Sequence, residues 1–218
     1  MRVPRIFLCI LLLAASAWGQ ADVHKIADRA DNFYNHIQSM QVHFTETYRG
    51  VGMQRSESGT LELKKPGKMR WDYDEPQKKL FLSDGHTAWF YVPGEQQVRK
   101  APVKKLDDLR SPLQYLLGKT KLEKEFENLS LAPDVTPSQS GDVVLRGIPK
   151  SMADRVSQVL LEITPEGHFR RIVIEELDGS TTEFLFSGEK TNVALADSQF
   201  KFVPPPGVET VEATGIAE

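Results

Sequence analysis

The chain has 218 residues, of which 40% are hydrophobic and 26% are charged, and its mean hydropathy is −0.36. The 27 basic and 30 acidic residues give a formal net charge of −3. This composition is typical of one soluble globular domain long enough to bury a core, and its mild acidity disfavours binding to nucleic acid or, by charge, to anionic membrane surfaces.

The first segment has the pattern of a secretory signal peptide. Arg2 and Arg5 precede the apolar run IFLCILLLAASAW, and small residues follow it. A transmembrane anchor would need about 20 apolar residues, more than this run contains. We therefore expect residues 1–19 to be a signal peptide, with cleavage after position 17, 19 or 21.

Cys9 is the only cysteine and lies inside this apolar run. A lipid-anchored bacterial protein carries its cysteine directly after the run, so we expect a mature chain without a lipid anchor, a disulfide or thiol chemistry. Loss of residues 1–19 would also remove two arginines and no acid, which leaves 25 basic against 30 acidic residues, a net charge of −5.

An amphipathic helix is predicted over residues 22–39. Apolar residues recur there with helical spacing, from Val23 and Ile26 to Phe33 and Ile37, and Asp22 is a candidate N-cap. Strand-like runs bounded by turn signals such as Pro-Gly and Asp-Gly follow at 41–50, 59–65, 68–73, 79–83, 87–92 and 96–101.

The pattern becomes helical between residues 106 and 128. Ser111 can cap a helix and Pro112 suits its first position, and three leucines at 113, 116 and 117 share one face. A second helical piece is expected near Leu122 and Phe126. A loop is predicted at 132–142, and strands resume at 143–147, 156–165, 169–177 and 181–189.

These elements predict a mainly β fold with helices (α+β) in a single domain. About ten or eleven short strands joined by tight turns favour an antiparallel sheet, strongly curled or closed, with two or three helices. No linker is long enough to divide the chain.

The sequence contains no recognisable catalytic or metal site. The five histidines lack zinc spacing, and the chain has neither a Gly-x-Ser-x-Gly elbow nor a phosphate-binding glycine loop. Asp72 and Asp74 share one strand face, but carboxylates on the polar face of an amphipathic strand are usually solvated. We expect no enzyme activity, no cofactor and no metal.

The opposite face of that strand is apolar. Met69, Trp71 and Tyr73 alternate with polar residues after the Pro66-Gly67 turn signal, so they share one side of the strand. Such a face is usually part of the core, but a curled sheet can also use it as the wall of a ligand cavity. The residues alone leave both possibilities open.

Five segments resemble, in this order, the periplasmic outer-membrane lipoprotein carrier family (LolA): FTETYRG, SGTLELKKPGKMRWDYDEP, LSDGHTAWFYVP, SPLQYLL and FKFVPPPGV. The resemblance covers about Val23 to Val208. It implies an incomplete antiparallel barrel of about eleven strands, with helices as a lid over its concave face. It also implies a carrier rather than an enzyme. Members take triacylated lipoproteins from an inner-membrane ATP-driven release complex to an outer-membrane lipoprotein acceptor.

The resemblance also implies which residues bind lipid. Met69 and Trp71 match an apolar residue and a tryptophan that line the family's cavity, and Leu113 and Leu116 match a lid helix. The full set expected to bind acyl chains is Leu61, Met69, Trp71, Tyr73, Leu80, Leu82, Trp89, Leu113, Leu116 and Leu117.

Lys65 stands where many members have an arginine that hydrogen-bonds lid backbone and holds the closed form. Lysine carries its donors on a point charge and cannot reproduce the planar fork of arginine. If it acts as the lid latch, we expect its ammonium group to lie near main-chain carbonyls at the end of the helix that begins at Pro112.

From the resemblance we expect residues 20–208 to form one carrier domain, and the protein to be a periplasmic monomer. Residues 209–218 lie beyond the resemblance and are expected to be a disordered tail. A periplasmic module of the same fold that senses lipid or lipoprotein would look alike in sequence and remains the alternative. The single domain without an anchor favours the carrier. A lipid-modifying hydrolase would need a nucleophile and a base beside the cavity, and we identify none.

Overall fold

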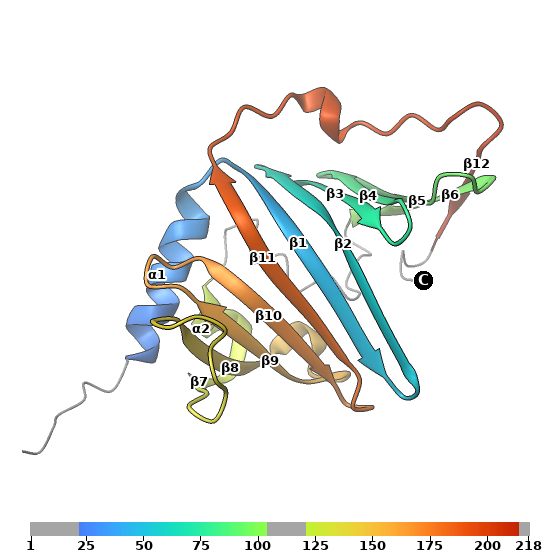
Figure 1. Ribbon diagram of the computed structural model, residues 1–218. Coiled ribbons are helices and arrows are strands. Elements are labelled where there is room, and N and C mark those ends of the chain that lie inside the picture. Colours follow the sequence, from blue (N-terminus) through green and yellow to red (C-terminus); the bar gives the residue numbers. More distant parts are fainter. Residues whose placement is uncertain (1–21, 104–120, 214–218) are drawn as a thin grey trace, which may run out of the picture.

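A computed structural model describes residues 22–103 and 121–213, and these form one open, curled sheet of twelve strands (Figure 1). The strand order is β12-β6-β5-β4-β3-β2-β1-β11-β10-β9-β8-β7. Neighbouring strands are antiparallel, except that β12 runs parallel to β6. The expected signal peptide and the leucines at 113, 116 and 117 lie outside the described residues.

The strands are β1 (Ser39–Gly50), β2 (Met53–Lys64), β3 (Lys68–Glu75), β4 (Lys79–Asp84), β5 (Thr87–Tyr91), β6 (Gln97–Pro102), β7 (Phe126–Leu131), β8 (Val143–Pro149), β9 (Val156–Ile163), β10 (Phe169–Glu176), β11 (Thr181–Thr191) and β12 (Glu209–Glu212). The helices are α1 (Val23–His36) and α2 (Leu122–Glu125), with short 3-10 turns η3 (Lys150–Met152) and η4 (Asp197–Phe200). In the described ranges, no helix is long and apolar enough to cross a membrane.

The mainly β fold is confirmed, and the predicted helix and ten strand runs correspond to α1, β1–β6 and β8–β11. Two strands were not predicted. The helical piece expected near Leu122 and Phe126 is only the four residues of α2, and Phe126 already begins β7. The disorder expected from residue 209 is wrong for β12, whose ends are fixed by bonds from Glu209 N to Gln96 O (2.8 Å) and from Ala213 N to Lys100 O (2.8 Å).

Helix α1 is capped as predicted and packs against one face of the sheet. The Asp22 side chain accepts a hydrogen bond from His24 N at 3.0 Å. Ile26, Ala30 and Tyr34 belong to the buried stripe of the helix, which has the 3.6-residue spacing. Figure 1 shows α1 at one side of the sheet, near β10 and β11.

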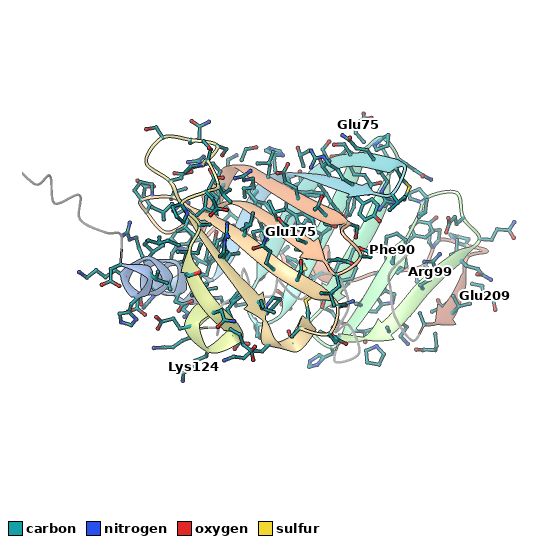
Figure 2. All side chains as sticks on the ribbon, turned by 90° about the horizontal axis from the view of Figure 1, so that it is seen from below. Glu75, Phe90, Arg99, Lys124, Glu175 and Glu209 are labelled. Carbon is teal, nitrogen blue, oxygen red and sulfur yellow. The ribbon has the colours of Figure 1, made fainter. Side chains whose placement is uncertain are left out.

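The sheet has two faces, and we call the one against which α1 packs the inner face. It carries most of the core, which includes Met40, Val42, Phe44, Leu61, Leu63, Met69, Trp71, Tyr73, Phe81, Ala88, Phe90, Leu145, Leu161, Ile172, Phe184 and Phe186. Lys124 on α2 and Glu209 on β12 mark opposite ends of the sheet (Figure 2).

The opposite, outer face is covered in part by the segment that leads from β11 to β12 (Figure 1). Phe200 of η4 is fully buried, and the Phe202 ring lies 6.3 Å from that of Trp89. Arg70 Nη1 donates to Gln199 O at 3.0 Å, and its guanidinium also binds Asp72. The predicted carboxylate pair therefore contributes one residue, Asp72, to an ion pair that holds this segment.

Candidate functional site

The strand register decides which side chains share the inner face with Trp71. Trp71 lies opposite Leu61 on β2 and Phe81 on β4, and Met69 lies opposite Leu63. Directly paired residues project to the same face of a sheet. The inner face therefore carries Leu61 together with Met69, Trp71 and Tyr73. Alternation along β3 had predicted that its three residues share one face.

An aromatic cluster surrounds Trp71. Its indole is 4.6 Å from the Phe44 ring and 5.8 Å from the Phe184 ring, both edge to face, and 6.4 Å from Tyr73. Edge-to-face pairs stabilise by about 0.5–1.5 kcal/mol beyond area burial. Trp71 is 0% exposed. Its Nε1 atom is buried and has no hydrogen-bond partner in the described part of the chain.

The expected placement of Leu80, Leu82 and Trp89 on this face is corrected by the register. Leu80 pairs with Asp72, and Leu82 pairs with both Arg70 and Trp89, so all three project to the outer face. Side chains alternate along a strand, and β4 has apolar residues on both sides of Phe81. The inner wall on β4 and β5 is instead formed by Phe81 and Phe90, which pair with each other.

The inner face ends in polar groups toward the β1–β2 turn. Tyr73 Oη donates to Glu46 Oε2 at 2.8 Å. Lys79 Nζ forms an ion pair with Glu57 Oε1 at 2.6 Å, and the two side chains are only 7% and 5% exposed. Arg55 Nε lies 3.5 Å from the other Glu57 oxygen. The apolar wall thus borders a buried ion pair that no pattern in the sequence indicated.

Lys65 ties the β2–β3 turn to the end of α1. Its Nζ donates to the carbonyl oxygens of Tyr34 (2.6 Å) and Asn35 (3.0 Å), and its backbone N donates to Gln38 O (2.9 Å). A cation is favourable there because the last carbonyls of a helix carry the negative end of its dipole. These carbonyls belong to α1, whereas the expected contact was with carbonyls at the end of the helix that begins at Pro112. The helix expected at Pro112 lies outside the described residues.

Two carboxyl groups are shielded from water where α1 meets its neighbours: Asp31 on α1 itself, and Glu189 on β11, whose side chain is 12% exposed. Burial raises the pKa of Glu189 to about 7, and its Oε1 lies 3.1 Å from His168 Nδ1. Desolvation also raises the pKa of Tyr34 and lowers that of His168. Burial raises the pKa of Asp31 to about 6, and both of its oxygens accept from Leu122 N. These groups join α1 to β10, β11 and α2.

These pKa values predict that stability decreases as the pH rises. Between about pH 4.5 and pH 7 the Glu189 carboxyl is protonated in the folded state and ionised in the unfolded state. The folded state then binds more protons, so its stability is lost as the pH passes through the folded pKa. Urea denaturation at pH 4.5, 6 and 8 should show this decrease, and Glu189→Gln should flatten it.

The control is Glu166→Gln, because Glu166 is an exposed carboxyl whose pKa is lowered by its hydrogen bond to Thr164. Removal of a carboxyl with a lowered pKa should not flatten the decrease. If Glu189→Gln leaves the pH profile of the wild type unchanged, the assignment of a raised pKa to Glu189 is wrong.

Comparison with known proteins gives concordant matches. A family model described as "Outer membrane lipoprotein carrier protein LolA" matches residues 35–203. A protein of Nitrosospira multiformis named outer-membrane lipoprotein carrier protein is 30% identical over 184 residues, which cover 83% of this chain and 85% of that one. A protein of the same name from Azotobacter vinelandii is 30% identical over 214 residues and covers 97% of this chain and 100% of its own length.

Among solved structures, an uncharacterized conserved protein from Thermus thermophilus has a TM-score of 0.52 at 15% identity. The match covers 87% of this chain and 98% of that one. At this identity the likeness concerns the fold alone.

Proposed function

The chain belongs to the outer membrane lipoprotein carrier (LolA) family, and we propose that it carries lipoproteins through the periplasm to the outer membrane with their acyl chains on the inner face. The observation that carries this proposal is the concentration of large apolar side chains, including Leu61, Met69 and Trp71, on one face of an open sheet. Methionine suits such a wall because its side chain is flexible and polarizable.

The energy of hydrocarbon in water explains why a carrier needs this face. Burial of one CH₂ group is favourable by about 0.8 kcal/mol, so moving one acyl chain of roughly fifteen methylenes into water costs about 12 kcal/mol. A triacylated lipoprotein has three such chains. It leaves a membrane at a useful rate only if another apolar surface receives the chains.

Membership of the family also suggests the partners. We propose an inner-membrane ATP-driven release complex as the donor and an outer-membrane lipoprotein acceptor as the recipient, with this protein as a monomer between them. The support is that the relatives are named outer-membrane lipoprotein carrier proteins.

Native mass spectrometry of the protein purified from the periplasm tests this function. We expect a complex whose extra mass equals that of a triacylated lipoprotein, and a protein mass that begins after residue 17, 19 or 21. Bound phospholipid or fatty acid without any lipoprotein would contradict the carrier function and favour a lipid-sensing role. A mass that includes residues 1–19 would contradict the signal peptide.

Substitution of Lys65 tests whether its contact with α1 controls access to the inner face. Lys65→Met removes both bonds to the α1 carbonyls and should lower the free energy of unfolding by about 1 kcal/mol. Arginine can supply more donors from a planar fork, so Lys65→Arg should hold α1 more firmly. Stopped-flow uptake of a fluorescent fatty acid should then be faster in Lys65→Met and slower in Lys65→Arg than in the wild type. Equal rates in all three proteins would mean that position 65 does not control entry.

A further inference from the structure

The indole N–H of Trp71 is a buried donor without an acceptor among residues 22–103 and 121–213. Its Nε1 atom has no hydrogen-bond partner in the described ranges, although Trp71 is 0% exposed. The large majority of buried polar atoms in proteins are hydrogen-bonded, so an exception calls for an explanation. Indole is a donor only, and the missing partner must therefore be an acceptor.

The side chains around Trp71 offer little to this donor. Phe44 and Phe184 present aromatic rings, and N–H···π contacts are weak. The Tyr73 hydroxyl donates to Glu46 and keeps lone pairs that could accept, but in the described ranges it makes no hydrogen bond with the indole. Among the described residues, the aromatic rings packed around the indole thus leave its N–H without an acceptor, as expected if its partner arrives with a ligand.

Along β3, the inner face is apolar on one side of Trp71 and becomes polar on the other. Met69, on one side of Trp71, pairs with Leu63 and lies in the core. Tyr73, on the other side, has its ring centroid 5.3 Å from the ammonium group of Lys79, which binds Glu57. Trp71 thus lies between an apolar section and a polar section of the same face.

We propose that the Trp71 Nε1–H donates a hydrogen bond to the carbonyl oxygen of a bound acyl group, so that the inner face selects acyl over alkyl chains. This inference rests on the proposed function and names the chemical group that the site recognises. The carbonyl is the polar group directly next to the hydrocarbon of every ester- or amide-linked acyl chain. In this arrangement the methylenes of the acyl chain lie toward Met69, and the polar part of the ligand lies toward Lys79.

Two synthetic probes test the proposal. The first is a peptide with an N-terminal diacylglyceryl-cysteine bearing short chains, and the second is the same peptide with dialkyl ether chains, which lack the carbonyls. A buried site built to hydrogen-bond a group discriminates against the analogue that lacks it. Isothermal titration calorimetry should show that the wild type binds the ester probe about threefold to tenfold more tightly than the ether probe.

Trp71→Phe should reduce this ratio to near one, because phenylalanine has no N–H. The matched control is Trp89→Phe, on the outer face, which should keep the ratio of the wild type. A second measurement does not depend on the folding of Trp71→Phe. In the ¹H–¹⁵N spectrum of the wild-type protein, the ester probe should move the indole proton of Trp71 downfield, and the ether probe should not.

The outcomes separate this inference from the proposed function. Equal affinities of the wild type for both probes, together with equal positions of the Trp71 indole signal, would overturn the hydrogen bond and leave acyl-chain binding intact. Binding of neither probe would contradict the proposed function, and the inference would fall with it.

Discussion

Replacement of Lys79 by methionine is expected to lower the free energy of unfolding by about 3–5 kcal/mol, because it leaves a carboxylate buried without its partner. In the folded protein Lys79 Nζ lies 2.6 Å from Glu57 Oε1, and both side chains are almost inaccessible to water. Arg55 approaches the other Glu57 oxygen at 3.5 Å. Because Arg55 would still compensate part of the Glu57 charge, we expect a loss of stability near the lower end of this range.

Urea denaturation measures this effect, and two variants control it. Lys100→Met makes the same chemical change in an exposed ion pair with Glu212 and should cost less than about 1 kcal/mol. The double variant Glu57→Gln, Lys79→Met removes both charges and should recover most of the loss. If Lys79→Met costs no more than Lys100→Met, the pair is hydrated in solution and the polar end of the inner face is not buried.

Replacement of Met69 by glutamate should lower the affinity for a fluorescent acyl-chain probe by at least about tenfold. Met69 is 6% exposed on the inner face, and an unpaired carboxylate there costs several kcal/mol. The cost falls on stability as well as on binding, because the side chain is buried without ligand. Binding should therefore be measured where circular dichroism shows that the variant is folded.

Met53→Glu is the matched control for this change. Met53 is 56% exposed at the start of β2, so the same substitution there should alter neither stability nor affinity. An equal loss of affinity in both variants would indicate a general effect of charge. Unchanged affinity in Met69→Glu would exclude Met69 from the acyl-binding surface.

The fold was predictable wherever the pattern of apolar residues was local. The helical stripe and Asp22 predicted α1, and the period of two predicted most strands. The first half of β2 was missed because residues 53–58 are mostly polar. Their place in the sheet depends on pairing with β1, which apolar alternation does not reveal. Strand β12 was missed for a related reason, since its place depends on a distant partner, β6.

The candidate site was predictable only in part, because sequence patterns do not identify the two faces of a strand that is apolar on both. Alternation placed Met69, Trp71 and Tyr73 together. It gave no basis for separating Phe81 from Leu82 in β4, because the outer face is covered by Phe202 and its neighbours, far along the chain. The contact of Lys65 with Tyr34 of α1, 31 positions earlier in the chain, likewise has no local pattern that indicates it.

The most direct test of the central claim, that acyl chains lie on the inner face, is photo-crosslinking followed by mass spectrometry. A diazirine amino acid would replace either Met69 on the inner face or Leu185, which projects from the outer face of β11 between Phe184 and Phe186. After irradiation of cells that export each variant, we expect adducts with lipoprotein acyl chains at position 69 and none at position 185. Adducts at position 185 without any at position 69 would contradict the claim.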